Sequence, residues 1–110
     1  MASRTNNPRF DHWCRIYRLT GGDELNPPNE EEVLYEGKCM IYEANNLRAY
    51  REGIAYKEDM GCDIPGLLDT VRIGDLIDYN RYGIEAKRLT INTPIPSKMG
   101  STFRFNQSKI

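Results

Sequence analysis

The sequence of 110 residues predicts an all-β fold, a small single-domain β-barrel of about six antiparallel strands with long projecting loops. Two observations predict this class. Short stretches rich in aromatic and aliphatic residues recur along the chain, and glycine or proline turn signals separate them. Helical spacing is confined to residues 43–52, which lack a strong cap and are expected to form a loop. A barrel or a sandwich suits such strands, and barrel closure also removes exposed sheet edges.

The first two strands flank a long loop. Residues 10–19 (FDHWCRIYRL) and 33–42 (VLYEGKCMIY) are typical of strands. Gly37 lies in the middle of the second strand and indicates a bulge or a close approach of the backbone. Residues 20–32 (TGGDELNPPNEEE) are expected to be an irregular loop, because paired glycines and paired prolines disfavour regular structure. Residues 1–11 are expected to form a flexible N-terminal arm ahead of the barrel domain.

The third strand has the clearest pattern. Residues 53–64 alternate between two faces, and this period of two is that of a strand. Pro65 and Gly66 end it. The face expected to point inward carries Ile54, Tyr56, Met60, Cys62 and Ile64.

The segment TVRIGDLIDY, residues 70–79, interrupts a hydrophobic run with Gly74 and Asp75. Glycine adopts positive φ without steric cost, so we expect the chain to turn at Gly74 and to enter the fourth strand at Leu76. Tyr82–Gly83 is the next turn signal. The segment is therefore interpreted as a corner of the scaffold and not as a reactive site.

Two strands complete the barrel. In residues 84–92 the apolar register shifts between Ala86 and Leu89, which predicts a bulge or a barrel corner. Residues 93–101 are expected to be a loop. Residues 102–106 (TFRFN) form the closing strand.

Charge is distributed unevenly along a chain whose net charge is −1. Residues 1–19 carry four arginines and one acid, whereas residues 20–36 carry six acids and no base. The near-neutral total argues against a protein that binds nucleic acid in a basic groove. The acidic segment is either a solvated surface or a patch complementary to a basic neighbour, which would set the register of a head-to-tail assembly.

The residue types that carry chemistry are sparse. Cys14, Cys39 and Cys62 stand far apart at no metal-ligand spacing, and His12 is the only histidine. The odd cysteine count argues against a secreted disulfide scaffold, so the cysteines are expected to act as small buried hydrophobes. We expect no metal and no cofactor.

No catalytic constellation stands out, and we do not expect an enzyme. A single histidine weakens any Ser–His or Cys–His scheme. The segment YNRYG, residues 79–83, would either stack a base between two tyrosines or form a tyrosine-rich β-turn. No apolar run approaches the length of a membrane span, so no membrane partner is expected.

Several segments follow one another in a characteristic order. They are CRIYRL (14–19), VLYEGKCMIY (33–42), DIPGL (63–67), VRIGDLIDY (71–79) and STFRFNQSKI (101–110). Their order and spacing resemble the head-closure (stopper) proteins of tailed bacteriophages, which are small β-barrels of the head–tail connector. The resemblance covers roughly residues 12–110.

The resemblance implies a virion structural protein. Many copies of the chain would form a homo-oligomeric ring, a dodecamer if it follows the symmetry of the portal, below the portal or adaptor protein. The ring would close the DNA channel, retain the packaged DNA and offer a docking surface to tail proteins. Its location would be the virion, after assembly in the host cytoplasm.

The resemblance also implies particular site residues. The loop between the second and third strands would face the channel, where its arginines could contact DNA phosphates. That loop comprises Asn45, Asn46, Leu47, Arg48, Ala49, Tyr50, Arg51 and Glu52. Contacts to other subunits are expected from the basic arm and the acidic segment, at Arg4, Arg9, Asp23, Glu24, Glu30, Glu31 and Glu32.

Two alternatives stay open. The chain could be another phage ring protein, with an adaptor or tail-completion role. It could instead be a cellular OB-like or SH3-like module that recognises nucleic acid or peptide. Salt dependence would identify a nucleic-acid binder, because its affinity falls steeply as salt rises.

Overall fold

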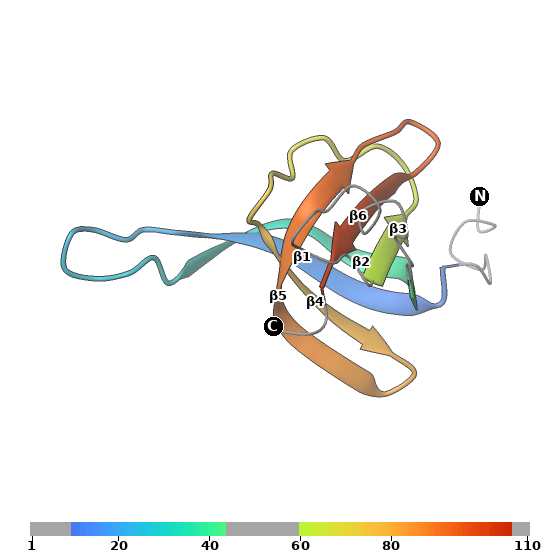
Figure 1. Ribbon diagram of the computed structural model, residues 1–110, viewed down its shortest axis with the longest axis horizontal. Helices are drawn as coiled ribbons and strands as arrows, with labels where there is room; N and C mark the ends of the chain where they lie inside the picture. The colour runs from blue at the N-terminus through green and yellow to red at the C-terminus, as the bar shows by residue number, and fades with distance from the viewer. Residues whose placement is uncertain (1–9, 44–59, 107–110) are drawn as a thin grey trace, which may run out of the picture.

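The computed structural model describes residues 10–43 and 60–106. Six antiparallel strands close into a barrel in the order β1-β2-β3-β6-β5-β4 (Figure 1). The described residues contain no helix, and hence none that could cross a membrane. The predicted all-β class and the small barrel are therefore confirmed. The strands are β1 (His12–Thr20), β2 (Glu30–Glu43), β3 (Met60–Ile64), β4 (Leu76–Arg81), β5 (Ile84–Ile95) and β6 (Ser101–Phe105).

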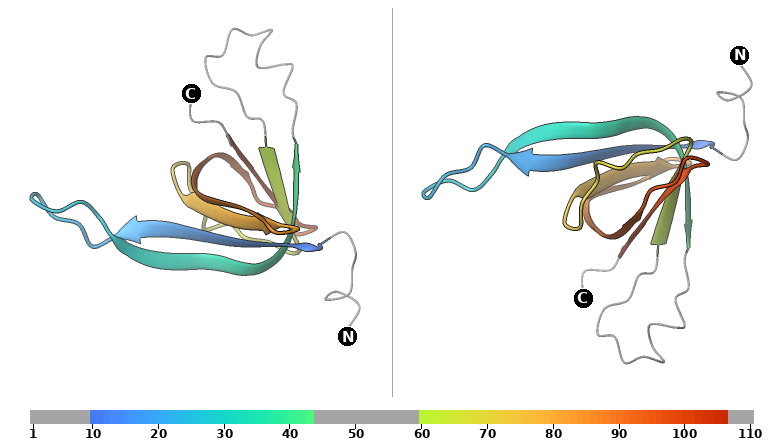
Figure 2. Two further views of the ribbon diagram at one scale, coloured as in Figure 1. Left: turned by 90° about the horizontal axis from the view of Figure 1, so that it is seen from below. Right: turned by 90° about the horizontal axis from the view of Figure 1, so that it is seen from above.

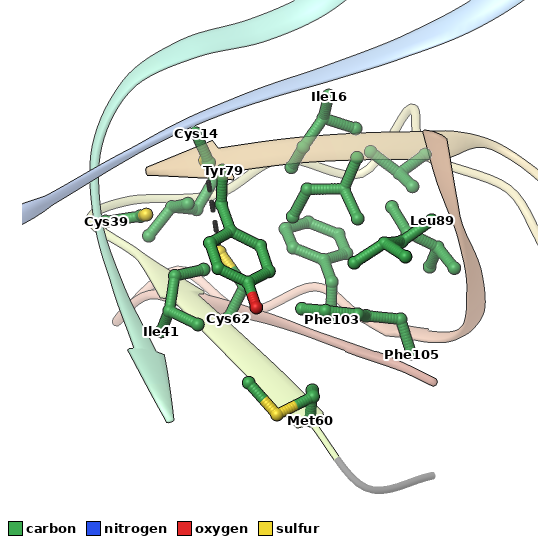
Figure 3. Packing of buried hydrophobic residues seen from close by; sticks show 14 residues of the cluster. Cys14, Ile16, Cys39, Ile41, Met60, Cys62, Tyr79, Leu89, Phe103 and Phe105 are labelled. Carbon is green, nitrogen blue, oxygen red and sulfur yellow. Dashed lines mark hydrogen bonds between the residues drawn. The ribbon is translucent and has the colours of Figure 1, made fainter. Parts of the chain in front are cut away.

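Side chains fill the interior of the barrel (Figure 3). Every strand contributes alternate residues to this core, as the period of a strand requires. On β3 the inward residues are Met60, Cys62 and Ile64, as the sequence predicted. The other members of the core are Cys14, Ile16, Cys39, Ile41, Val71, Ile77, Tyr79, Leu89, Ile91, Phe103 and Phe105.

The β1–β2 hairpin is longer than the sequence predicted. Strand β2 begins at Glu30, so the acidic run 30–36 lies on a strand and the irregular loop is shorter than expected. Backbone pairing with β1 explains the difference, because Glu30 lies opposite Thr20 and Glu32 lies opposite Arg18. Glutamate has a low intrinsic preference for strands, and this cross-strand pairing overrides it.

The segment 70–79 forms the predicted corner. Gly74 has a φ of +100° and donates its N–H to the carbonyl of Ile91 at 2.9 Å. Ile91 in turn donates its N–H to the carbonyl of Asp75 at 2.8 Å. These bonds attach the corner to β5, and β4 begins at Leu76 as expected.

The predicted irregularity in β5 is a bulge. Ile77 lies opposite Leu89 and Tyr79 lies opposite Ala86, so two residues of β5 face Asp78 alone. One of them, Arg88, has a φ of +57°, and it donates its N–H to Asp78 Oδ1 at 2.9 Å. The backbone N–H of the extra residue therefore has a specific side-chain acceptor, which holds the bulge in place.

Strand β5 also continues further than predicted, to Ile95. The sequence assigned residues 93–101, which include Pro94 and Pro96, to a loop. Pro94 lies opposite Phe103 of β6, and β4 pairs with β5 only as far as Thr90. Pro94 thus lies where β5 has a partner on one side only, which is where a strand tolerates proline.

At Gly37 the sequence predicted a bulge or a close approach of the backbone, but the near neighbour in the structure is a side chain. The ring of Tyr35 lies beside this glycine, and a Cβ at Gly37 would stand 3.3 Å from the Tyr35 hydroxyl. That hydroxyl donates to the carbonyl of Lys38 at 2.6 Å.

Candidate functional site

The predicted site residues fall into two groups. The loop Asn45–Glu52, which the resemblance predicted to face the channel, lies outside the described residues, as do the arm residues Arg4 and Arg9. The five predicted acidic contacts all lie on the β1–β2 hairpin, and the fold brings them together. They are Asp23, Glu24, Glu30, Glu31 and Glu32.

The hairpin projects beyond the barrel (Figures 1 and 2). Strand β1 pairs with β4 only through Trp13–Tyr17, whereas its pairing with β2 continues to Thr20. From Arg18 onward the two strands therefore pair only with each other. We call residues 18–32 the hairpin arm. It carries five acidic residues and one arginine.

An ion pair fixes the base of the hairpin arm to the barrel corner. Arg18 Nε and Nη2 donate to the two carboxylate oxygens of Asp75, each at 2.9 Å, and Nη2 also donates to the carbonyl of Thr70 at 2.9 Å. Asp75 is 5% exposed and also accepts the N–H of Arg72 at 2.8 Å. Burial acts to raise the pKa of Asp75, but these donors outweigh it and lower that pKa below its usual value.

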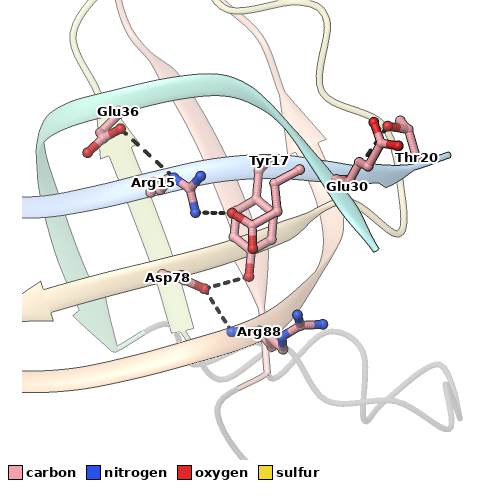
Figure 4. A network of polar contacts seen from close by, with 8 residues as sticks. Arg15, Tyr17, Thr20, Glu30, Glu36, Asp78 and Arg88 are labelled. Carbon is pink, nitrogen blue, oxygen red and sulfur yellow. Dashed lines mark hydrogen bonds and ion pairs between the residues drawn. The ribbon is translucent and has the colours of Figure 1, made fainter. Parts of the chain in front are cut away.

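A second group of contacts links Glu31 of the arm to β1 and β4 (Figure 4). Arg15 forms an ion pair with Glu31 and lies 5.0 Å from the ring centre of Tyr17. The Tyr17 hydroxyl donates to Asp78 Oδ1 at 2.8 Å. Burial and then this carboxylate raise the pKa of Tyr17 to about 12, so the hydroxyl stays a donor at neutral pH. The arm thus has a defined direction relative to the barrel.

Asp23 organises the tip of the arm. Its Oδ1 accepts the backbone N–H groups of Asn26 and Leu25, at 2.8 and 2.9 Å. These donors lower the pKa of Asp23, so the charge persists to acidic pH. An aspartate that caps its own turn in this way orders a short loop. The role of Asp23 is therefore structural, and Leu25 beside it is almost fully exposed.

The hairpin arm has uncompensated negative charge. Glu24, Glu30 and Glu32 are exposed and form no ion pair with the described residues. Exposed carboxylates gathered on one projection produce a local negative potential that attracts a basic surface. The arrangement can therefore orient a partner that carries a basic surface.

A shallow groove lies on the outer surface of the barrel, across β1, β4 and β5. Its volume is about 350 Å³. Trp13, which is 38% exposed, forms part of its wall. The groove is lined by charges of both signs: Arg15 and Lys87 are positive, and Asp78 and Glu85 are negative.

Tyr79 and Tyr82 do not form a platform for a base. Tyr79 is 3% exposed and lies in the core, whereas Tyr82 is 74% exposed. The Tyr82 ring meets the edge of His12, with ring centres 4.7 Å apart, and its hydroxyl donates to Asp11 at 3.2 Å. The segment 79–83 is therefore a β-turn with one tyrosine inside and one outside.

The three cysteines, separate in sequence, meet in the core. Their sulfurs all lie within 4.8 Å of one another, and Cys62 Sγ donates to Cys14 Sγ at 3.9 Å. Hydrogen bonding lowers the pKa of Cys39, whereas burial raises the pKa of Cys62. The wide spacing of the three cysteines along the sequence did not indicate this cluster. Its signal in the sequence was a cysteine at an inward position on each of three consecutive strands.

His12 is a packed, buried residue next to this cluster in the sheet. It lies opposite Cys39 in the β1–β2 pairing, and its Nδ1 accepts the N–H of Ile41 at 2.9 Å. Its Nε2 is buried and has no hydrogen-bond partner among the described residues. The hydrogen bond to Nδ1 therefore holds the ring against β2.

Comparison with known proteins does not assign a family: no family model matches the chain, and no curated protein or solved structure matches it significantly.

Proposed function

We propose that this chain is a structural protein of the head–tail connector of a tailed bacteriophage. In this proposal many copies form a ring below the portal or adaptor protein. The ring closes the DNA channel and presents a surface to tail proteins. The resemblance in motif order suggests this class, and the hairpin arm is the single observation that supports it most directly.

The filled interior of the barrel supports an assembly role. Core side chains from all six strands occupy the space that a ligand would need. Large residues such as Phe103 and Phe105 are completely buried there. A small barrel packed in this way acts through its outer surface and its projections.

The hairpin arm supports head-to-tail contact between copies. A heterologous ring requires two different, complementary patches on each subunit. The arm is acidic and fixed to the barrel. Of the four arginines in residues 1–19, Arg15 and Arg18 form ion pairs within the chain, so Arg4 and Arg9 would supply the basic charge. We propose that the arm of one copy docks near the basic N-terminal segment of the next copy. The charges would then set the register, and apolar contacts would supply the rest of the affinity.

The proposal is tested by reversing charge on the arm. The variant Glu24→Lys/Glu30→Lys alters two exposed carboxylates that make no ion pair with the described residues. We expect the isolated variant to fold normally, because exposed substitutions usually change stability by less than about 0.5 kcal/mol. We expect it to be missing from virus particles when it replaces the wild-type chain during infection.

A matched control tests whether the position of the reversed charges matters, and not only the change in net charge. The variant Asp69→Lys/Glu85→Lys makes the same change in charge at two exposed sites on the barrel. It should enter particles at the wild-type level and support infection. Equal incorporation of both variants, or equal loss of both, would contradict a role for the arm in docking.

The groove beside Trp13 favours a second candidate function, recognition of a peptide. An aromatic wall with charges of both signs suits a peptide better than a nucleic acid, which would need a predominantly basic surface. Trp13 is the only tryptophan, so its fluorescence reports on this groove alone. A saturable change in this fluorescence on titration with peptides from candidate partner proteins would support this function, and Trp13→Ala should abolish the binding.

A further inference from the structure

We propose that Cys14, Cys39 and Cys62 form a binding site for a soft, thiophilic metal ion that takes three sulfur ligands, with Cu(I) as the probe. This site lies in the barrel core and is independent of the hairpin arm. A test of this metal site is therefore independent of any test of the proposed function.

The spacing of the sulfurs fits a metal ion. A thiolate–metal bond is about 2.3 Å long, so three sulfurs around one ion in a plane are separated by about 4.0 Å. Cys14 Sγ and Cys62 Sγ are 3.9 Å apart, and no pair in the cluster exceeds 4.8 Å. An ion could thus enter the centre of the triangle with only small movements of side chains.

The scaffold places these sulfurs together through three separate strands. Cys14 lies on β1, Cys39 on β2 and Cys62 on β3, all pointing inward and completely buried (Figure 3). Strand pairing fixes each backbone, since Cys14 lies opposite Gly37 and Cys62 lies opposite Ile41. Ligands held on strands are positioned more accurately than ligands held on loops.

The ligand set favours a soft ion of low coordination number. Thiolates select ions such as Cu(I) and Zn(II), whereas hard ions prefer oxygen. A structural zinc site needs four ligands. Among the described residues, no further histidine, cysteine or carboxylate joins the three sulfurs within the same reach. Three sulfurs without a fourth ligand suit Cu(I) better than Zn(II).

Binding is an exchange of protons for a metal ion. Each sulfur that coordinates loses its proton to the solvent and donates an electron pair to the ion. No electron is transferred, so the ion keeps its oxidation state. Because all three sulfurs are buried, the ion enters when the barrel opens locally or while it folds, and its release should be slow.

The test is a titration of the full chain, purified without metal and in the presence of reductant. Cu(I) is supplied from a competing chelator under anaerobic conditions. We expect one Cu(I) per chain in native mass spectrometry and a higher Tm for the loaded protein, because a ligand that binds only the folded state stabilises it. X-ray absorption at the copper edge should report sulfur ligands alone, about three of them at roughly 2.3 Å.

Variants identify the ligands. Cys39→Ser should weaken Cu(I) binding by at least roughly tenfold, since loss even of an outer-shell partner commonly costs that much. The control is Met60→Leu, which removes a sulfur from β3 in the same core that is not one of the three thiols. It should bind Cu(I) like the wild type. If Cys39→Ser does not fold, X-ray absorption of the wild-type chain still decides the question.

Three results would overturn the proposal. The first is failure of the wild-type chain to retain Cu(I) against the chelator, even when refolded in its presence. The second is a copper site with nitrogen or oxygen ligands in place of the three sulfurs. The third is retention of Zn(II) but not of Cu(I), which would show a four-ligand site completed from elsewhere.

Discussion

Arg18 and Asp75, which are 57 residues apart in sequence, form two parallel hydrogen bonds of 2.9 Å each. The pair joins the base of the hairpin arm to the corner that contains Gly74. Asp75 is almost fully buried and also accepts a backbone N–H from Arg72. A paired arginine and carboxylate in this geometry restricts direction as well as distance. The direction of the arm therefore depends on the corner of the barrel.

Replacing Asp75 with Asn should destabilise the barrel and loosen the arm. The amide cannot accept from both nitrogens of Arg18, and its NH₂ group faces a donor. We expect a loss of about 1–3 kcal/mol in the free energy of unfolding, the range for an unsatisfied buried partner. Urea denaturation measures it. Glu85→Gln, an exposed carboxylate-to-amide change on β5, is the control and should be nearly silent.

Asp75 also predicts how stability depends on pH. Its pKa in the folded chain is lowered, so the carboxylate stabilises the fold above its unfolded pKa of about 3.9. That contribution is lost as the pH falls through the lower, folded pKa. We expect the wild-type chain to lose more stability between about pH 5 and pH 2 than Asp75→Asn does. Parallel pH profiles for the two proteins would contradict this assignment.

Gly61 should not tolerate a side chain. A Cβ there would stand 2.6 Å from the ring of Tyr42, which lies opposite on β2. The Tyr42 hydroxyl donates to Asp63 Oδ1 at 3.0 Å, and Thr102 donates to the same oxygen at 2.8 Å. The ring is therefore held in place. We expect Gly61→Ala to cost about 1–3 kcal/mol, as overpacking usually does.

A double-mutant cycle checks this explanation for Gly61. In a Tyr42→Ser background the ring is absent, so most of the penalty for Gly61→Ala should disappear. Thermal unfolding of the four proteins gives the coupling between the two sites. An unchanged penalty in the Tyr42→Ser background would place the cause in the backbone and not in the ring.

Ser101 joins the loop after β3 to β6. Its hydroxyl donates to the carbonyl of Gly66 at 3.0 Å and accepts the N–H of Leu68 at 2.9 Å, in a site with no exposure. Ser101→Ala should cost about 1–3 kcal/mol in the free energy of unfolding, because it leaves buried backbone groups without a partner. Chemical denaturation measures this. As the control, Ser97→Ala removes only an exposed hydrogen bond, from the Met99 N–H to Ser97 Oγ at 3.2 Å, and should change stability by less than about 0.5 kcal/mol.

The loop Asn45–Glu52 gives a prediction that comes from the sequence alone. If Arg48 and Arg51 contact DNA in the channel, Arg48→Ala/Arg51→Ala should yield particles that assemble but leak or eject their DNA prematurely. The measurement is the fraction of DNA-filled particles after storage and the infectivity of the preparation. Wild-type values for both would exclude the channel role of this loop.

Local patterns predicted most of the fold. Alternation identified β3, and the glycine at position 74 identified the corner, because both depend on residues close together in sequence. The start of β2 was missed, since glutamates pair there only because β1 lies opposite. The thiol cluster was missed for a similar reason. Linear spacing does not report distance across paired strands, so Cys14, Cys39 and Cys62 looked unrelated until the barrel closed.

The acidic charge of the hairpin arm could be predicted from the sequence, but its length and its attachment to the barrel could not. The sequence placed an acidic segment between the first two strands. It did not predict that pairing of Thr20 with Glu30 extends the hairpin, or that Arg18 fixes its base to Asp75. Both features arise from contacts across the fold, which local propensity does not encode.

The most direct measurement for the proposed function is the copy number of this chain in purified, DNA-filled particles of the bacteriophage that the proposal implies. Quantitative mass spectrometry would compare this chain with the portal subunit in the same particles. A connector ring of matching symmetry predicts a fixed ratio close to one chain per portal subunit. Absence of the chain from these particles would contradict the proposal and direct attention to the groove beside Trp13.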